Sequence, residues 1–356
     1  MTKLVMPRYR GFNLLDLFST SNRWDEHFPM THGEFLEDDF RFLNEWGFNF
    51  VRVPMSYLYF VADSSRRKIL ESKLETLDRL VRLGEKYGVH ISLSFHRAPG
   101  YCVTAYPFDV KEIGNLWKNK DDLELFCFYW EAFARRYQGV SNNKLSFDLV
   151  NEPPNLADGA LKELTPLLSD VTTAEYIHVH RTATERIHAI DPDRMVIIEG
   201  SNGTMTPSEE LKDLPNAVQS MHHYFPMYVT HHKCPWISEI DDSKWPYPYE
   251  GIMNGQVDVW DKKHIRDLSD AWFRFAREGY SVHLGECGCY KYTPHEVVLR
   301  WFEDLLDIVK ENNIGFSLWN FKGPFGILDS ERKDVDYEDW YGHKLDRKLL
   351  NLLQKY

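Results

Sequence analysis

The sequence predicts a single α/β domain, a (β/α)8 or TIM barrel that spans residues 1–356. Three observations indicate it: short apolar runs that look like buried strands, amphipathic segments between them, and polar side chains where the runs end. Eight strands with intervening helices match the strand number and chain length of such a barrel. The runs are apolar without alternation, as expected where both faces of a parallel strand are covered.

Each element is placed by its own pattern. The expected strands are Tyr9–Asn13, Asn49–Pro54, His90–His96, Leu145–Glu152, Met195–Gly200, Ala217–Tyr224, Ser281–Glu286 and Ile314–Asn320. The expected helices are Gly33–Trp46, Glu71–Tyr87, Asp121–Tyr137, Thr172–Ile190, Asp261–Arg277, Pro294–Asn312 and Lys344–Leu353. Thr293-Pro294 predicts a helix start, and Gly88 and Gly139 predict helix ends. Between the fifth and sixth strands only a short helix fits, around Pro207–Asp213. A doubly wound open sheet is the alternative fold, but no GxGxxG follows the first strand.

Two connections are longer than the fold requires, and both are rich in aromatic residues. Arg97–Asn119 follows strand 3 and holds Tyr101, Tyr106, Pro107 and Trp117, while Phe225–Trp260 follows strand 6 and holds Trp236, Trp245, Tyr247 and Tyr249. Loops of this length in a compact domain are usually functional. Because both follow strand ends, we expect them over the same mouth of the barrel.

Composition excludes several classes of function. The net charge of −12 argues against nucleic-acid binding, because an acidic surface repels phosphate. The sequence has no run of eighteen apolar residues, so no membrane span is predicted. Met1–Arg10 lacks the apolar core of a signal peptide, which indicates a cytoplasmic protein or the mature form of a secreted one. The five cysteines form no disulfide framework. The aromatic content of 15% fits either a well-filled core or a cleft lined with flat rings. No cofactor or metal is expected, and the oligomeric state is not predicted.

Polar residues gather at the predicted strand ends. Glu152 follows the run Leu145–Val150, and Glu286 follows Tyr280–Leu284. Other strand ends carry Arg52, His96-Arg97, Asn151, His222-His223-Tyr224 and Trp319-Asn320. In a parallel barrel the carboxyl ends of all strands meet at one rim, where the chemistry takes place. Asn13, at the end of the first strand, is either structural or part of this rim.

Two carboxylates at one rim indicate retaining glycoside hydrolysis. One attacks the anomeric carbon, the other protonates the leaving oxygen, and their oxygens are expected roughly 5 Å apart. The attacking carboxylate needs a low pKa, which Arg52 and a tyrosine hydroxyl would supply. The acid needs a raised pKa, which the charge of the attacking carboxylate would supply.

The segments Phe50–Pro54, Phe147–Pro153, His222–Tyr224, Leu284–Gly288 and Leu318-Trp319 resemble glycoside hydrolase family 5, the cellulase family of clan A. The resemblance extends from about Gly11 to Trp319, and the stretch Phe225–Trp236 is similar to a loop of several endoglucanases. It implies that Glu152 is the acid/base and Glu286 the nucleophile. Six further residues are implied to line the substrate site or support the nucleophile: Arg52, His96, Asn151, His222, Tyr224 and Trp319. Cys287 departs from the family, where Phe is common, and so does the pair His96-Arg97.

The function expected from these residues is hydrolysis of β-linked glucan or mannan chains or oligosaccharides by double displacement. An exo-acting β-glucosidase or β-mannosidase on short oligosaccharides is the alternative, with Tyr247–Trp260 closing one end of the cleft. A metal-dependent barrel of the amidohydrolase kind would need His-x-His on the first strand, and Gly11-Phe-Asn13 offers none. The histidine pairs 222–223 and 231–232 do not suit a shared metal, because neighbouring strand residues point to opposite faces. A carbohydrate-binding barrel without catalysis would not need both glutamates.

Overall fold

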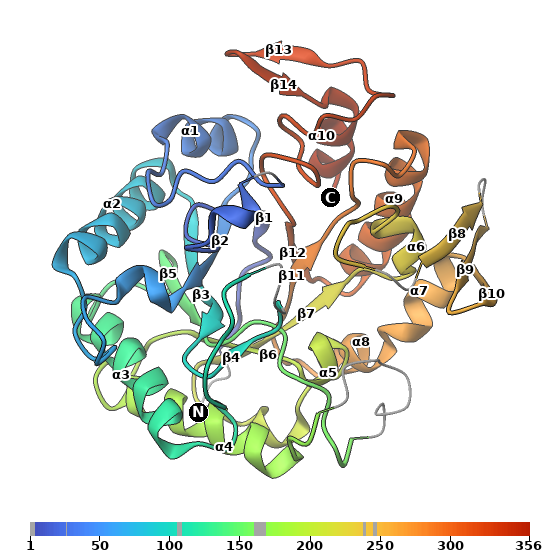
Figure 1. The fold of residues 1–356 in the computed structure, drawn as a ribbon. Coiled ribbons are helices and arrows are strands. Elements are labelled where there is room, and N and C mark those ends of the chain that lie inside the picture. The colour runs from blue at the N-terminus through green and yellow to red at the C-terminus, as the bar shows by residue number, and fades with distance from the viewer. Residues whose placement is uncertain (1–3, 26, 105–108, 160–168, 238–239, 245–247) are drawn as a thin grey trace.

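Eight parallel strands form a closed barrel in a computed structural model that describes residues 4–25, 27–104, 109–159, 169–237, 240–244 and 248–356 (Figure 1). They are β1 Arg10–Asn13, β2 Phe50–Ser56, β3 His90–Ala98, β5 Leu145–Asp148, β6 Val196–Glu199, β7 Ala217–His223, β11 Val282–Cys287 and β12 Gly315–Leu318. Each strand pairs with the next in the chain, and β1 pairs with both β2 and β12, which closes the ring. The predicted (β/α)8 barrel is confirmed.

The closure between β1 and β2 depends on a glycine. A Cβ atom on Gly11 would lie 1.7 Å from the backbone oxygen of Phe50. No side chain fits at that distance, so the first two strands approach this closely only because residue 11 is glycine.

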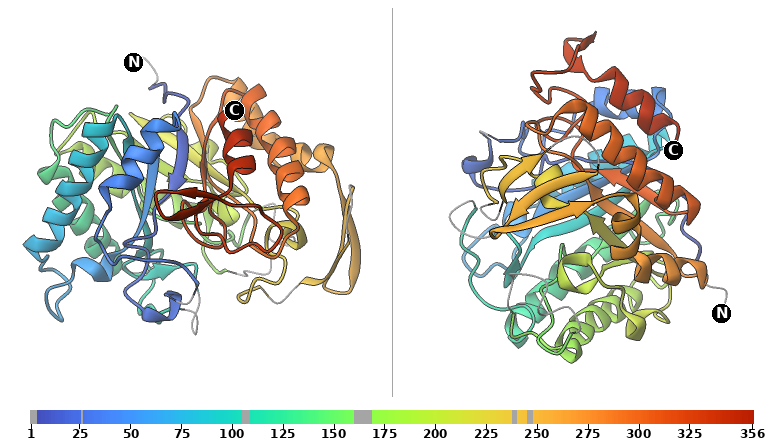
Figure 2. Two further views of the ribbon diagram at one scale, coloured as in Figure 1. Left: turned by 90° about the horizontal axis from the view of Figure 1, so that it is seen from above. Right: turned by 90° about the vertical axis from the view of Figure 1, so that its right-hand side faces the viewer.

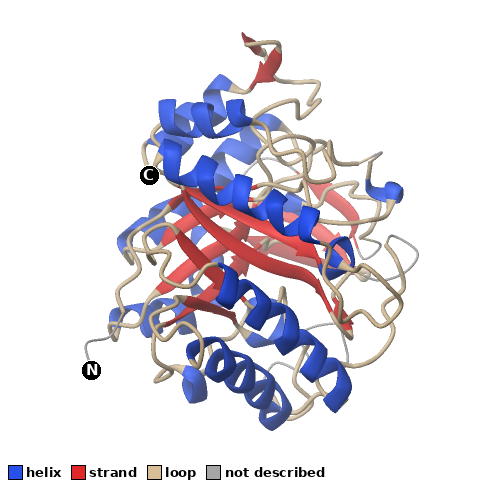
Figure 3. Cartoon of the chain, turned by 90° about the vertical axis from the view of Figure 1, so that its left-hand side faces the viewer, coloured by secondary structure: helices blue, strands red, loops and turns tan. Residues whose placement is uncertain are grey.

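Helices cover the outside of the barrel, while the strands lie inside (Figure 3). They are α1 Glu37–Glu45, α2 Glu71–Tyr87, α3 Lys120–Arg136, α4 Thr173–His188, α7 Lys262–Leu268, α8 Asp270–Arg277, α9 His295–Glu311 and α10 Arg347–Gln354. The predicted end of α2 is confirmed, since Gly88 adopts the left-handed conformation with φ 66°. The connection from β6 to β7 is as short as predicted, with α5 Ser201–Thr204 and the 3₁₀ helix Glu209–Leu211.

The helix expected over Asp261–Arg277 is instead two helices that meet at Ser269. This serine is buried, and its hydroxyl lies 3.0 Å from Nδ1 of His223 on β7. This contact connects the two helices to strand β7 of the barrel. The helical periodicity of the sequence did not reveal the break.

The two long connections contain strands as well as loops. After β3, the short strand β4 Tyr101–Cys102 turns back antiparallel onto Arg97 and Ala98. After β7 come α6 Met227–Thr230 and an antiparallel sheet of β8 Ile240–Lys244, β9 Tyr249–Met253 and β10 Gln256–Trp260, which stands at one side of the barrel (Figure 2). Tyr106, Pro107, Trp245 and Tyr247 lie outside the described residues. A hairpin of β13 Glu338–Trp340 and β14 His343–Leu345 precedes α10, so that helix starts three residues later than expected.

Strand β2 shows why the runs lack alternation. All seven of its residues are buried. Val51, Val53 and Met55 join the apolar layer between strands and helices, whereas Arg52 points into the barrel and binds side chains of other strands. A strand in this position is covered on both faces. Among the described residues, no helix has both the length and the apolar character needed to cross a bilayer.

Candidate active site

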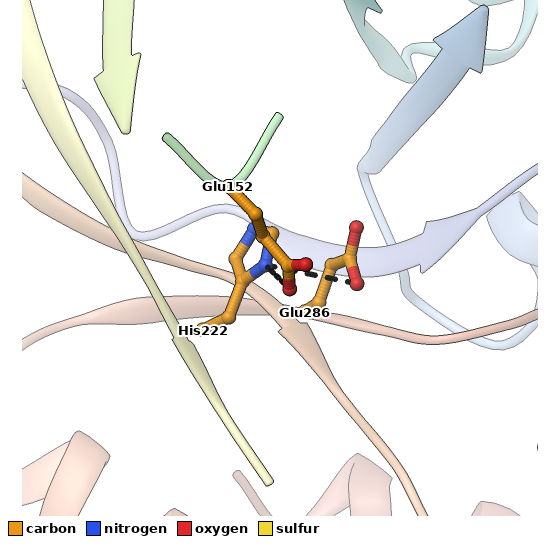
Figure 4. Close-up of side chains that lie close together, drawn as sticks. All are labelled: Glu152, His222 and Glu286. Carbon is orange, nitrogen blue, oxygen red and sulfur yellow. Dashed lines mark hydrogen bonds and ion pairs between the residues drawn. The ribbon is translucent and has the colours of Figure 1, made fainter. Parts of the chain in front are cut away.

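Glu152, Glu286 and His222 meet at the carboxyl-terminal end of the barrel (Figure 4). Glu152 follows β5, while Glu286 and His222 lie near the ends of β11 and β7. One oxygen of each carboxylate and one ring nitrogen of His222 all lie within 4.8 Å of one another. Two glutamates far apart in the chain thus converge at about the expected distance.

Arg52 lies at the centre of this cluster and is 1% exposed. It donates to Asp148 at 2.7 Å, to Glu199 at 2.6 Å and to Glu286 at 2.6 Å. Burial alone would lower the pKa of the guanidinium, but the three carboxylates raise it above its ordinary value. Arg52 is therefore a permanent cation that holds three carboxylates together.

The remaining donors of Arg52 are also occupied within the protein. They reach the side-chain oxygens of Asn13 at 3.0 Å, Ser94 at 2.9 Å and Asn151 at 2.8 Å. Arg52 consequently has no donor left for a substrate, and its position is that of a support for Glu286.

Glu286 is held from two sides. Arg52 donates to Oε1, and the hydroxyl of Tyr224 donates to Oε2 at 2.9 Å. Burial raises the pKa of Glu286 to about 7, although His222 and Arg52 act in the opposite direction. The low pKa expected from the sequence is thus not found, because the loss of solvation outweighs the two cations.

The glycine before Glu286 sets the distance to β7. A Cβ atom on Gly285 would lie 2.6 Å from the hydroxyl oxygen of Ser220 and 3.1 Å from Nε2 of His222. A larger residue would therefore push against the Ser220 hydroxyl and press on the edge of the His222 ring.

Glu152 adopts a strained backbone conformation with φ 44°. A non-glycine residue in the left-handed region typically stores about 1–3 kcal/mol. Both of its backbone polar groups are bound by side chains: its N–H donates to Glu199 Oε2 at 2.6 Å, and its C=O accepts from the Tyr101 hydroxyl at 2.5 Å. The Glu152 side chain is 22% exposed, against 5% for Glu286. Glu152 is therefore the more accessible of the two carboxylates.

His222 lies between the carboxylates. Its Nδ1 is 2.9 Å from Glu152 Oε1 and 3.7 Å from Glu286 Oε2, while its Nε2 is 3.3 Å from Glu199 Oε1. Burial alone would lower the pKa of His222, but Glu199, Glu286 and Glu152 raise it well above its ordinary value. These carboxylates therefore favour the protonated form of the ring.

Asn13 and Asn151 differ in their hydrogen bonds. Asn13 accepts from Arg52 and donates to the backbone oxygens of Gly285 and Leu318 at 3.0 and 3.3 Å, which makes it a structural link between strands. Asn151 is fully buried, and its Nδ2 has no hydrogen-bond partner among the described residues.

Trp319 and His96 form an aromatic wall beside the glutamates. Their ring centroids are 5.9 Å apart in a stacked arrangement. Phe18 and Phe28, from the loop after β1, pack edge-on against Trp319, and Trp236 from the loop after β7 packs on Phe28. Burial and the charge of Arg52 hold the pKa of His96 well below its ordinary value, so this ring is neutral.

Several polar residues at strand ends do not join the cluster. Arg97 is buried in ion pairs with Asp109 at 3.2 Å and Glu112 at 3.0 Å, which anchor the loop after β3. His223 faces away from His222 toward Ser269, as expected for neighbours on a strand. His231 contacts Thr230 inside the loop after β7.

Glu199 and Asp148 belong to the cluster, but sequence reasoning missed them. Glu199 is the last residue of β6, directly before Gly200, and follows the same pattern that singled out Glu286. The rule used for the other strand ends would have found it. Asp148 lies inside an apolar run, and only the strand's inward face identifies it.

The chain matches a known protein family and is similar in sequence to characterised relatives. The sequence profile described as cellulase, glycosyl hydrolase family 5, matches residues 10–324. Endoglucanase C from Acetivibrio thermocellus is 26% identical over 326 residues, which cover 85% of this chain and 88% of that protein. Cellodextrinase A from Ruminococcus flavefaciens is 24% identical, over 78% of this chain and 76% of that protein.

A solved structure gives the same result. The crystal structure of a glycoside hydrolase superposes with a TM-score of 0.84 and 35% identity, covering 98% of this chain and 99% of that one. The chain therefore belongs to the cellulase family, glycosyl hydrolase family 5, and is a glycoside hydrolase.

Proposed function

We propose that the protein hydrolyses the β-glycosidic bonds of glucans or their oligosaccharides with retention of configuration. The observation that carries the proposal is the approach of Glu152 and Glu286, whose oxygens lie within 4.8 Å of each other. Retaining enzymes place their carboxyl groups about 5–5.5 Å apart, whereas inverting enzymes leave room for a water between them.

In this mechanism Glu286 is the nucleophile. Arg52 and Tyr224 fix both of its oxygens, so one of them is aimed at the anomeric carbon while the charge is stabilised. Attack forms an ester between Glu286 and the sugar and breaks the bond to the leaving oxygen. That ester removes the negative charge that faces Glu152 and His222.

Glu152 is the acid and then the base. It gives a proton to the leaving oxygen in the first step and takes one from water in the second. Its greater exposure supports this role. A cavity of about 480 Å³ is lined by Trp117, Pro154 and Tyr101 among others, and the Tyr101 hydroxyl donates to the Glu152 carbonyl.

His96, Asn151, His222, Tyr224 and Trp319 surround the sugar that is cleaved. The unpartnered amide of Asn151 is suited to the 2-hydroxyl, a contact that strengthens in the transition state. The Trp319 ring is suited to the apolar face of the pyranose.

Glucan is favoured over mannan because the relatives named above are an endoglucanase and a cellodextrinase. Exo-action on short oligosaccharides is the second candidate. Trp24 and Trp236 pack edge-on with ring centroids 5.3 Å apart, and they join the loops after β1 and β7 beside Trp319. The expected barrier, Tyr247–Trp260, largely forms β9 and β10 at the side of the barrel instead.

Four experiments test the proposal. A 2-deoxy-2-fluoro cellobioside with a good leaving group should label the peptide that contains Glu286, and NMR of fresh hydrolysate should show the β-anomer first. An α-anomer, or label on another peptide, would refute the mechanism. A product profile on cello- and manno-oligosaccharides separates endo- from exo-action, and exhaustive chelation should leave activity unchanged.

A further inference from the structure

Glu199 is a third glutamate below the pair and is completely buried. Its carboxylate faces three donors: Arg52 Nη2 at 2.6 Å, the Glu152 backbone N–H at 2.6 Å and His222 Nε2 at 3.3 Å. A carboxylate surrounded in this way does not reach a substrate. Whatever it contributes to the reaction passes through the groups it holds.

Glu199 faces His222 through one ring nitrogen, Nε2. Nε2 has no aligned hydrogen-bond partner among the described residues, and Glu199 Oε1 is its ion-pair neighbour at 3.3 Å. Burial alone would raise the pKa of Glu199, but His222 and Arg52 lower it to about 2. Glu199 thus stays ionised, and a proton on Nε2 is the one it stabilises.

The other ring nitrogen of His222 then faces Glu152. One proton lies between Nδ1 and Glu152 Oε1, which are 2.9 Å apart. It resides either on the carboxyl group, beside a neutral ring, or on the ring, beside a carboxylate.

We propose that Glu199 is a positioning residue that holds the Nε2 proton of His222 and the backbone N–H of Glu152, so that His222 and Glu152 share the proton delivered to the leaving group. The inference rests on the proposed acid/base role of Glu152. In the first step the shared proton moves to the leaving oxygen as Glu286 bonds to the sugar, and His222 is left neutral with its proton on Nε2. In the second step, water gives its hydroxyl group to the sugar as the ester bond to Glu286 breaks and frees the Glu286 carboxylate, and the remaining proton of the water returns to the pair.

The charges around the ring set the pH at which this proton is lost. The groups facing His222 are Glu152 and Asp148 after and on β5, Glu199 on β6, Glu286 and His283 on β11, Arg52 on β2, His96 on β3 and the Tyr224 hydroxyl. Removing the negative charge of Glu199 destabilises the imidazolium. The shared proton would then leave at a lower pH.

Asp148 provides a matched control. It is buried and accepts from Arg52 Nε at 2.7 Å, as Glu199 accepts from Nη2, but within the described part of the chain it forms no hydrogen bond or ion pair with Glu152 or His222. Glu199→Gln and Asp148→Asn each remove one carboxyl group that binds Arg52. Only Glu199 also contacts His222 and the Glu152 backbone N–H directly, whereas Asp148 acts on His222 through its charge alone.

The first measurement does not need activity. In the full chain labelled with ¹⁵N-histidine, with His222 assigned by its loss in His222→Gln, we expect a protonated Nε2 at neutral pH. In Glu199→Gln this signal should titrate at lower pH, and in Asp148→Asn less so. If Nε2 of His222 carries no proton and Nδ1 carries one in the wild type, the inference is overturned even if the proposed hydrolysis is established.

The second measurement compares leaving groups. Glu199→Gln should lower kcat/KM on a cello-oligosaccharide about tenfold more than on a dinitrophenyl cellobioside, as part of the 10²–10⁴-fold that proton transfer typically contributes. The basic limb of its pH profile should move to lower pH, whereas Asp148→Asn should affect both substrates equally. Equal losses in Glu199→Gln would overturn the inference. If that variant does not fold, Glu199→Asp keeps the charge at a longer distance and should show the same leaving-group bias to a smaller degree. If the wild type hydrolyses neither substrate, the proposed function fails, and the NMR measurement alone decides the inference.

Discussion

The two ends of the barrel treat buried histidine in opposite ways. His222, at the carboxyl end, has a pKa raised well above its ordinary value because Glu199 and Glu286 outweigh burial. His283 lies three residues before Glu286 on β11, and burial lowers its pKa to about 3. Its neighbours are the rings of Phe50, at 4.4 Å between centroids, and, beyond Phe50, His90. Both imidazoles are buried, but one is a cation and the other is neutral.

The difference teaches that burial alone does not decide charge in this barrel. Strand β2 begins at Phe50, and Arg52 lies two residues further toward the carboxyl end of the strand at Ser56. Arg52 gathers carboxylates around itself, and these keep His222 charged. The end with the charges is the end where barrels place their chemistry, whereas the opposite end serves stability.

The largest effect expected at the charged end comes from Glu286. Replacing it by Ala removes the proposed nucleophile, and kcat should fall about a thousandfold or more, because the loss of one member of a catalytic unit removes most of the rate that the whole unit contributes. Initial rates on a cello-oligosaccharide would show it. Activity within tenfold of wild type would contradict the role assigned to Glu286.

Arg52 is the next test, because it forms ion pairs with three buried carboxylates. Arg52→Met should lower the free energy of unfolding by about 3–5 kcal/mol, as expected when one member of a buried ion pair is removed. The unpaired carboxylates then have raised pKa values in the folded state, so ionising them costs more in the folded chain than in the unfolded one. The loss in free energy of unfolding should therefore grow as pH rises and shrink as pH falls. Urea unfolding at pH 5 and pH 7 measures this. A loss independent of pH would mean that Arg52 acts through packing instead of charge.

A pH profile tests the charge of Glu286 itself. The pKa of Glu286 is raised to about 7, so its nucleophilic, ionised form is lost as pH falls below that value. We expect the acidic limb of kcat/KM near pH 7. A limb near the ordinary glutamate value would show that Arg52 and His222 outweigh burial after all.

The smallest effect is expected at the neutral end. Neither ring nitrogen of His283 has a hydrogen-bond partner among the described residues. His283→Leu removes an unsatisfied polar group and should stabilise the protein by up to about 1 kcal/mol, since such groups cost about 1–3 kcal/mol. The folded-state pKa of His283 is depressed, so the wild type loses stability as pH falls below about 6.5 and the variant should lose less. Thermal melting at pH 7 and pH 5 measures both effects, and kcat/KM should not change.

Local patterns in the sequence were enough for the barrel and for most of its rim. The apolar runs located all eight strands, because a parallel strand covered on both faces carries apolar residues toward the surrounding helices. Glu152 and Glu286 stood out because a carboxylate directly after such a run is unusual. Ser269 escaped prediction because its partner, His223, is distant in the chain, so nothing in the helical periodicity marks the break.

The sequence by itself determined the order of strands and helices and which polar side chains would reach the carboxyl end of the barrel. Only the tertiary structure decided their charges. Asp148 and Glu199 come from β5 and β6, Arg52 from β2 and His222 from β7, and the charge of each depends on its distance to the others. Distances between strands are set when the barrel closes, at contacts such as Gly11 against Phe50, and no local pattern of residues records them.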